Sequence, residues 1–427
     1  MKRKNFGVVI LVLLSIFLHG FGSGMGEGLV EAEEVKSEKI ELLFYFPTQV
    51  GGDLASGMEE IVKDFNEQND KIEVTAVYTG SYKQTAQKAM ADIAAKNGPN
   101  VILSGLLDLV DYHNVDALED LKPYIEKEDK AWQEDFVEGF WESFKLEEDK
   151  IFGLPFQHSV NILFCNTDML KESGIEEVPT SWEDLAKAVE KLMEKNGSVV
   201  PFEFPSHPGI LENLTLCNDG KIVEDKTKTC LDSKEAVEAL DFMISLVKAG
   251  ATINDFSATA EDFVAETAAM VLTTNGNLAF VAKNAEFNWD VAPMPTKEEL
   301  TTTYGGGGLI MLADQCEEEK AASWEFMKYM TSPEVSAKWM TVSGYFAVRK
   351  SADEVEIADK YYKENPQLEK AKGYLEYVKS GAWSTDKYWD VHTVIQNALD
   401  LSLVDESISA EEALQQAQKE ATELLTK

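Results

Sequence analysis

Three polar residues, Gln157, His158 and Ser159, stand directly before the apolar run Val160–Cys165, which is short enough to form one buried strand. Amide, imidazole and hydroxyl groups at the mouth of a buried strand commonly face a cleft, where they can hydrogen-bond a small ligand. The same residues could equally do no more than close a surface loop. The local sequence leaves both interpretations open, so the choice depends on the rest of the chain.

Sequence motifs typical of enzymes are missing: the chain contains no nucleophile elbow, no P-loop and no HExxH pair. The glycine run Gly305–Gly308 lacks the Lys-Ser/Thr of a phosphate loop. It either lets a ligand approach backbone N–H groups or forms a flexible turn. The five histidines are dispersed and show no metal-ligand spacing. We therefore predict a protein that is not an enzyme and holds no metal or cofactor.

The length and charge of the chain narrow its class further. A chain of 427 residues is too long for a single hydrophobic core and suits two lobes. Its net charge of −37 argues against nucleic acid and anionic membranes as partners, because both require basic patches. Arginine occurs only as Arg3 and Arg349. This limits the choice of ligand, because a guanidinium is the preferred clamp for a phosphate.

The N-terminus has the pattern of a secretory signal peptide, which we place at residues 1–24. The basic residues Lys2–Lys4 precede the apolar run Val8–Leu18, which is shorter than the ~20 residues that span a bilayer. Small residues follow at Gly22–Gly24, where a signal peptidase would cut. No cysteine stands just after the apolar run, so we expect no lipid anchor there and a mature protein that is free in the periplasm or outside the cell.

The four cysteines allow two arrangements. Cys165 and Cys316 lie in or beside apolar runs, and we expect them to be buried free thiols. Cys217 and Cys230 flank a turn-rich segment that could fold back on itself. Because the chain is exported, a disulfide between these two is as plausible as two free thiols.

Strands and helices alternate along the first hundred residues of the predicted mature chain, which implies a parallel sheet. The predicted elements are Lys39–Phe46, Ala55–Gln68, Ile72–Val77, Tyr82–Lys96 and Val101–Leu103. Ligands of such sheets bind at the carboxyl ends of the strands. The segments that follow those ends, and are therefore cleft candidates, are Phe46–Gly52, Thr79–Tyr82 and Ser104–Asp108.

The rest of the chain continues with helices and short strands, and its last hundred residues are largely helical. Helices are predicted at Trp182–Glu194, Lys234–Lys248, Lys320–Met330 and Ala410–Leu425, and strands at Met270–Thr273 and Trp289–Pro293. The glycine run is expected to lead into a strand at Leu309–Ala313.

Six stretches carry a family resemblance over nearly all of the predicted mature chain. They are Thr79–Val101, Pro155–Ile175, Thr180–Leu192, Ala268–Val281, Gly305–Leu312 and Thr331–Ala352. In this order they resemble the extracellular solute-binding proteins of ABC importers, the group that contains maltose- and glycerol-3-phosphate-binding proteins. The Gly-Tyr at Gly344 and Tyr345, followed by an apolar and basic tail, is the most specific of these motifs.

The resemblance implies an α/β periplasmic-binding-protein fold, with two lobes joined by a multi-strand hinge and a ligand cleft between them. The first lobe would combine residues 38–157 with 278–331, and the second would combine 158–277 with 332–427. The chain would cross between the lobes near Pro155–Val160, Thr274–Leu278 and Ser332. A monomer of this kind binds a small-molecule solute and, on closing, presents itself to the permease subunits of the importer.

Within the family, the chain is most similar to the glycerol-3-phosphate-binding branch. The ligand contacts of that branch fall on Tyr82, Ser159, Thr274, Gly306 and Tyr345. Thr274 stands where the branch has a serine and keeps the hydroxyl. An acidic residue of the pattern falls on Leu106, and the nearby Asp108 could replace it.

Two departures from the branch bear on the solute. The phosphate-side arginine falls near His392–Thr393, where no arginine exists, and the tryptophan pair is missing around Ser206–Ile210. Trp383, Tyr388 and Trp389 cluster instead near the place of the arginine, where they could stack on sugar rings or simply pack the core. These departures from the branch therefore favour a neutral sugar, oligosaccharide or polyol, with Trp389 among its contacts.

Other functions stay open at this level. Glycerol-3-phosphate or a glycerophosphodiester could still bind through glycine N–H groups, hydroxyls and a charged His158 or His392. The same scaffold could serve a ligand sensor. A secreted hydrolase would need a pair of carboxylates at catalytic separation in the cleft.

Overall fold

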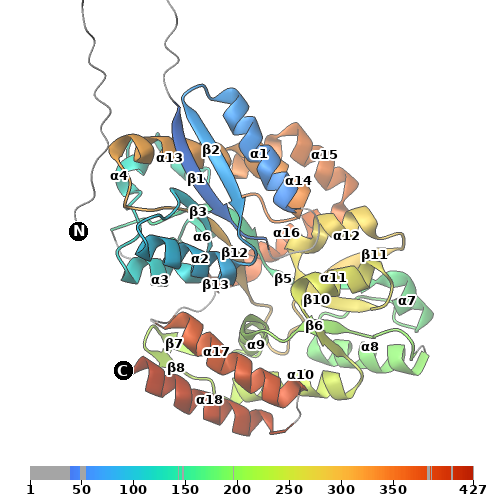
Figure 1. Cartoon of the computed structure of the whole chain (residues 1–427). Coiled ribbons are helices and arrows are strands. Elements are labelled where there is room, and N and C mark those ends of the chain that lie inside the picture. The colour runs from blue at the N-terminus through green and yellow to red at the C-terminus, as the bar shows by residue number, and fades with distance from the viewer. Residues whose placement is uncertain are drawn as a thin grey trace, which may run out of the picture. The chain divides into compact units, whose positions relative to one another are not determined.

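A computed structural model describes residues 39–48, 54–142, 144–146, 149–195, 197–381, 385, 387–404 and 407–426. The predicted signal peptide, most of the cleft candidate Phe46–Gly52 and Trp383 lie outside the described residues. Lys39–Lys427 forms one compact unit, which contains two mixed sheets and the helices that cover them (Figure 1).

The first sheet has the strand order β13-β12-β3-β1-β2, and β4 also pairs with β12. Its strands are β1 (Ile40–Phe46), β2 (Ile72–Tyr78), β3 (Val101–Gly105), β4 (Leu154–Ser159), β12 (Thr302–Met311) and β13 (Val378–Gly381). Strand β1 pairs in parallel with both β2 and β3, which confirms the predicted parallel arrangement.

Helices cover the first sheet through apolar faces that the sequence pattern already indicates. These helices are α1 (Leu54–Gln68), α2 (Tyr82–Ala94), α13 (Glu317–Met330) and α14 (Pro333–Ser343). In α1, the side chains of Met58, Ile61 and Phe65 are buried at helical spacing. Ser81 begins α2 with a capping box to Gln84, which fixes the start of the helix at the cleft candidate Thr79–Tyr82.

The second sheet has the order β11-β5-β10-β6-β9. Its strands are β5 (Asn161–Asn166), β6 (Glu203–Pro205), β9 (Thr252–Asn254), β10 (Met270–Thr274) and β11 (Trp289–Pro293). The core on one side of it takes in α8 (Trp182–Lys195), α9 (Pro208–Leu216), α10 (Lys234–Lys248), α17 (Tyr388–Leu399) and α18 (Ala410–Leu425). Helices α10 and α18 match their predicted bounds.

Shorter elements complete the fold. They are α3 (Leu109–Asn114), α4 (Lys122–Ile125), α5 (Lys130–Glu134), α6 (Glu138–Glu142), α7 (Thr167–Glu172), α11 (Phe256–Val264), α12 (Leu278–Asn284), α15 (Glu356–Glu364), α16 (Pro366–Gly373) and the hairpin β7 (Val223–Asp225) and β8 (Lys228–Thr229). No helix among the described residues is both long enough and apolar enough to cross a membrane.

The chain passes from the first sheet to the second at Val160, the one residue between β4 and β5, within the segment Pro155–Val160 where a crossing was expected. The return comes later than expected. Strand β11 still pairs with β5, the ring of Trp289 stacks on that of Phe164, and only β12 rejoins the first sheet. Residues 278–293 therefore lie with the second sheet, and β13, expected in the second lobe, pairs with β12 of the first sheet.

The glycine run lies inside strand β12. The interpretation of this run as a flexible turn is therefore wrong. Strands β3 and β4 flank β12 on both sides. A Cβ atom on Gly306 would overlap the carbonyl oxygen of Gln157, and one on Gly307 would overlap that of Ser104. Gly306 also has φ of +104°, which other residues rarely adopt. Close packing of three strands explains these glycines.

The structure decides one open question about the cysteines and corrects one prediction. No disulfide joins Cys217 to Cys230, and their thiols donate hydrogen bonds to the carbonyl oxygens of Thr301 and Lys221. Cys316 is exposed because it stands at the N-terminus of α13, whereas Cys165 is buried as expected.

Arg349, whose position the sequence left open, is only 3% exposed. Its guanidinium lies 3.9 Å from the ring centroid of Phe136 and donates from Nε to the carbonyl oxygen of Thr331 at 2.8 Å. The one arginine of the predicted mature chain therefore serves packing within the fold.

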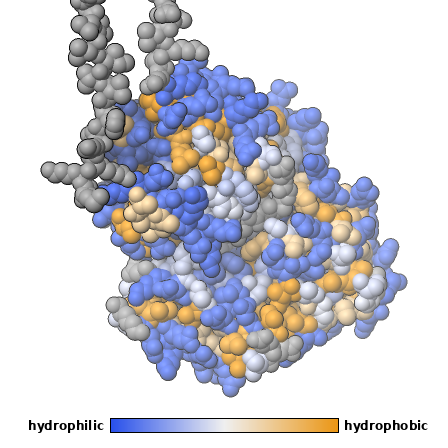
Figure 2. All heavy atoms as spheres, in the orientation of Figure 1, coloured by the Kyte–Doolittle hydropathy of each residue, from blue (hydrophilic) through white to orange (hydrophobic). Residues whose placement is uncertain are grey.

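Hydrophilic residues cover much of the visible surface, in keeping with the high charge (Figure 2).

Candidate ligand-binding site

A cavity of about 180 Å³ lies between elements of the two sheets. Its wall combines the turn after β3, the junction of β4 and β5, the first glycines of β12, and helices α9 and α17, which Figure 1 shows below the first sheet. The lining residues are Tyr82, Gly105–Asp108, Ser159–Asn161, His207, Gly209, Glu212, Asn213, Phe256, Thr274, Thr303–Gly306, Tyr345, Tyr388 and Trp389.

Seven of the eight residues expected at the site line this one cavity. They are Tyr82, Asp108, Ser159, Thr274, Gly306, Tyr345 and Trp389. They come from the start of α2, the turn after β3, the ends of β4 and β10, strand β12, the segment after α14, and the start of α17. The fold thus brings together positions that are more than three hundred residues apart in the chain.

Asp108 is the most deeply buried acid of the cavity, with 2% of its surface exposed. The indole Nε1 of Trp389 donates to its Oδ1 at 3.0 Å, which joins the turn after β3 to helix α17. Burial raises the pKa of Asp108 to about 7, so its carboxyl group favours the neutral form more than a carboxyl group exposed to water does. Asp108 rather than Leu106 therefore supplies the acidic group here, although both residues line the wall.

A chain of hydrogen bonds positions Tyr82. The amide Nε2 of Gln157 donates to the phenol oxygen of Tyr82 at 2.5 Å, and the indole of Trp339 donates to Oε1 of Gln157 at 2.9 Å. Burial and the neighbouring phenol of Tyr345 raise the pKa of Tyr82 well above its usual value. Tyr82 therefore offers a neutral hydroxyl in a fixed place.

His158, the eighth expected residue, does not line the cavity. Its side chain has no exposed surface and stacks on Phe140 with ring centroids 4.1 Å apart. Burial lowers its pKa to about 3, so the imidazole is neutral. Successive side chains of a strand point to opposite faces, and in β4 Ser159 takes the face of the cavity. The contact expected of His158 thus has no geometric support.

Several residues of the cavity were missed by the sequence analysis: His207, Glu212, Asn213, Phe256 and Tyr304. Tyr388, one of the aromatic residues that the sequence offered for stacking, also lines the wall. The sequence pattern around Ser206–Ile210 shows only the missing tryptophans, and at His392 it allowed a charged imidazole in place of the missing arginine. The structure places a histidine from each segment in contact, with Nε2 of His207 and Nε2 of His392 3.4 Å apart. Burial lowers the pKa of His207 to about 3 and that of His392 to about 4.

The ionisable side chains of the wall include acids but no lysine or arginine among the described residues. The acids are Asp108 and Glu212. The side chain of Asn213 bridges to strand β12, donating to Oγ1 of Thr303 at 2.9 Å and accepting from Oγ1 of Thr302 at 3.0 Å. Helix α9 is thereby held against the first sheet at the wall of the cavity.

Comparison with known proteins agrees with this geometry. A family model described as bacterial extracellular solute-binding protein matches residues 60–370, well over half of the chain. The chain belongs to this family. It is a solute-binding protein of the kind that serves ABC importers.

Relatives of this solute-binding protein bind different small molecules. The sn-glycerol-3-phosphate-binding periplasmic protein UgpB of Escherichia coli is 24% identical over 348 residues, which cover 75% of this chain and 77% of that protein. UgpB of Mycobacterium tuberculosis, solved with glycerophosphocholine, is 18% identical with a TM-score of 0.81, covering 91% of this chain and 98% of that one. Maltose-bound MalE3 of T. maritima is 20% identical with a TM-score of 0.80, covering 90% and 100%. The expected fold and family are confirmed.

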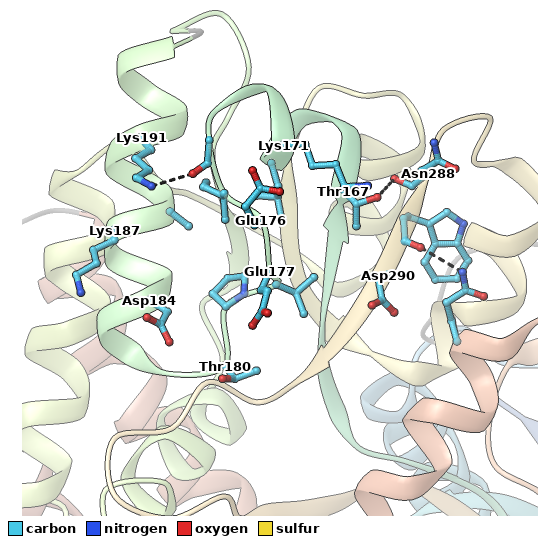
Figure 3. Close-up of a pocket in the computed structure, with 18 of the residues that line it drawn as sticks. Thr167, Lys171, Glu176, Glu177, Thr180, Asp184, Lys187, Lys191, Asn288 and Asp290 are labelled. Carbon is cyan, nitrogen blue, oxygen red and sulfur yellow. Dashed lines mark hydrogen bonds between the residues drawn. The ribbon is translucent and has the colours of Figure 1, made fainter.

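A larger hollow of about 1240 Å³ lies at the second sheet, between the N-terminal part of α8, the loop after α7, β11 and α16 (Figure 3). Its wall carries lysines and acids that engage one another or the backbone. Lys191 donates to the carbonyl oxygen of Gly174 at 3.0 Å, and Lys370 pairs with Asp290 at 2.6 Å. None of the expected site residues lines it. The smaller cavity, which seven expected residues line, is therefore the candidate site.

Proposed function

We propose that this solute-binding protein holds a small carbohydrate or polyol in the cavity between its sheets and delivers it to a membrane permease. Export by a cleaved signal peptide, the absence of a lipid anchor, a monomeric state and the absence of catalysis are parts of the same proposal. The relatives compared above are named for binding rather than for turnover, which supports the last of these.

The observation that carries the proposal is the chemistry of the cavity wall. Neutral phenol and hydroxyl groups of Tyr82, Ser159 and Thr274 share the wall with aromatic rings, and no lysine or arginine lines it within the described residues. Sugars and polyols bind to such surfaces through hydroxyl hydrogen bonds and apolar ring faces. A phosphate would instead meet the carboxylates of Asp108 and Glu212.

The size and placement of the cavity indicate how binding works. Its volume of about 180 Å³ is below the range of roughly 300–1,000 Å³ that holds drug-sized ligands, so a single small unit fits better than an oligosaccharide. A solute in contact with both Asp108, beside the first sheet, and Thr274, at the end of β10, favours the arrangement in which both sides contact it.

Glycerol-3-phosphate or a glycerophosphodiester is the alternative solute, supported by the names of the two UgpB relatives. It would require the glycine backbone and the histidine pair to replace the missing guanidinium.

A thermal-shift and calorimetry screen of the mature protein tests the proposal, with monosaccharides, oligosaccharides, polyols, glycerol-3-phosphate and glycerophosphodiesters as probes. A sugar or polyol at a hundredfold excess over Kd should stabilise the folded state by about 2.7 kcal/mol. Tyr82→Ala and Tyr345→Ala should each weaken that binding by ~1–3 kcal/mol, because each removes a hydroxyl and a ring from the wall. Stabilisation by the phosphates alone would overturn the sugar assignment, and conversion of a bound probe to products would contradict the assignment as a binding protein.

A further inference from the structure

Two histidines from distant segments meet beside the cavity. His207 lines the wall, and His392 lies on α17, with the centroids of the two rings 5.1 Å apart. Their Nε2 atoms are 3.4 Å apart, within reach of a long hydrogen bond. Such a bond needs one nitrogen that carries a hydrogen and one that does not, so the tautomers of the two rings set its direction.

The surroundings of His207 decide its tautomer. His207 is the N-cap of α9, and its Nδ1 accepts the backbone N–H of Gly209 at 3.0 Å. An accepting Nδ1 carries no hydrogen, so the hydrogen of the neutral ring lies on Nε2. Burial lowers the pKa of His207 to about 3 and that of His392 to about 4, so both rings are neutral at pH 7. The Nε2–H of His207 therefore donates to Nε2 of His392, which carries its own hydrogen on Nδ1.

This hydrogen bond joins the two helices that carry much of the wall. Gln396 supports the same contact, because its Nε2 donates to Oγ of Ser206 at 3.2 Å. The pair therefore fixes where the lining side chains of α9 and α17 stand around a solute. These lining residues are Gly209, Glu212 and Asn213 of α9 and Tyr388 and Trp389 of α17.

The neutral pair has no place for a further proton. Its two nitrogens without hydrogen are Nδ1 of His207 and Nε2 of His392, and both already accept a hydrogen bond. A proton added to either nitrogen would bring two N–H groups face to face and break that bond. Protonation would therefore either remove the cap of α9 or separate α9 from α17.

The ionisable groups around the pair come from five places in the fold. Lys83 lowers the pKa of His392, which adds to the effect of burial. The phenol of Tyr388, whose ring centroid is 5.6 Å from that of His392, is neutral because burial raises its pKa well above 10. The groups are Lys83 of α2, Asp108 after β3, Glu212 of α9, Asp255 at the start of α11, and Tyr388 and Asp390 of α17.

We propose that the hydrogen bond from His207 to His392 positions the wall of the cavity, and that the solute binds only while this pair is neutral. This inference rests on the proposed function, since it concerns the same cavity. His207 acts as a positioning residue, because both of its ring nitrogens are engaged within the protein.

Long-range ¹H–¹⁵N NMR spectra of the mature protein report the tautomers directly. We expect His207 in the Nε2–H form and His392 in the Nδ1–H form at pH 7, with the signals assigned from variants of each residue. The opposite tautomer at His207, or a protonated ring at either position at pH 7, would overturn the inference.

Variants test whether the bond matters for binding. The probe for calorimetry is the sugar or polyol that gives the largest shift in the screen above, with glucose, maltose and ribitol in its panel. His392→Leu removes the acceptor and should weaken binding at pH 7 at least tenfold, whereas His392→Gln supplies an acceptor oxygen and should restore the affinity to within threefold of the natural protein.

A double-mutant cycle separates the bond from other effects of the two residues. His207→Asn keeps a side-chain oxygen that caps α9 and loses the Nε2–H donor, so it should weaken binding as His392→Leu does. The double variant should lose no more affinity than either single variant, because both remove the same bond. His113→Leu is the control: His113 packs on Phe152, does not line the cavity, and should leave the affinity unchanged. Melting curves verify that each variant folds.

The pH profile gives a readout that packing alone would not change. The affinity of the natural protein divided by that of His392→Gln should fall about twofold between pH 6 and pH 4, because half of the His392 rings bind a proton at pH 4. Asp108 titrates in both proteins, so this ratio isolates the histidine.

The possible failures are distinguishable. A probe that binds His392→Leu as tightly as the natural protein, or a ratio that stays constant with pH, would overturn the inference and leave the proposed function standing. If no sugar or polyol of the screen binds the natural protein, the proposed function fails and the inference fails with it.

Discussion

At the scale of single residues, several groups in and near the cavity are buried, and their burial couples the stability of the fold to protonation. Burial raises the pKa of Asp108 from 3.8 to about 7, so the folded protein binds this proton more tightly than the unfolded chain does. The carboxyl group therefore contributes stability that is fully present below pH 3.8 and is lost as the pH rises through 7. His158, His207 and His392 act in the opposite direction, because burial lowers the pKa of each.

Asp108→Asn isolates one of these contributions. The melting temperature of the variant minus that of the natural protein should increase between pH 4 and pH 8, because the amide carries no charge at any pH. The difference in unfolding free energy has an upper limit of about 4 kcal/mol, since three pKa units at about 1.4 kcal/mol each separate the two states. Melting curves at intervals of half a pH unit measure it.

Glu203→Gln is the matched control for this experiment. Glu203 lies in β6, outside the cavity, and burial raises its pKa to about 7 as well. The control should show the same pH-dependent gain in stability without any change in solute affinity. A melting difference for Asp108→Asn that stays constant with pH would contradict the pKa shift.

At the scale of elements, the sequence predicted what depends on local pattern and missed what depends on distant pairing. The apolar spacing of α1 and the caps of α2 and α10 are encoded within a few residues. The membership of β11 in the second sheet and of β13 in the first depends on strands far away in the chain. The resemblance placed seven site residues at the cavity, yet strand alternation at His158 and the contributions of α9 required coordinates.

The glycine run gives a prediction at this scale. Gly306→Ala should destabilise the protein by ~3 kcal/mol or more, because Gly306 has a positive φ and a methyl group would overlap the backbone of β4. Gly373→Ala is the control: nothing lies within 4 Å of the added carbon, and the residue belongs to helix α16. It should raise stability by up to ~1 kcal/mol. Urea unfolding measures both, and equal effects would contradict the role of strand packing.

At the scale of the whole molecule, the bond from Trp389 to Asp108 spans the cavity. Asp108 belongs to the turn after a strand of the first sheet, and Trp389 packs against the core of the second. A hydrogen bond in this place favours the arrangement in which the two sides approach each other, even before a solute binds.

Trp389→Phe keeps an aromatic ring and removes the donor. We expect the unliganded variant to have a larger radius of gyration in X-ray scattering than the natural protein, and solute to restore the smaller value. Trp324→Phe is the control. The indole of Trp324 donates a hydrogen bond of 3.0 Å to Glu128, and neither residue lines the cavity. An unliganded Trp389→Phe that scatters like the natural protein would show that the bond does not influence closure.

The lack of disulfides among the cysteines, all four of which lie in the described residues, has a consequence for how the protein matures. Packing, hydrogen bonds and ion pairs hold the described fold without a covalent cross-link. A polypeptide that crosses a membrane unfolded and then relies on disulfides must wait for an oxidant and for the correct partner thiols. We therefore expect this chain to refold equally well with and without a reducing agent, which refolding yields under the two conditions would measure.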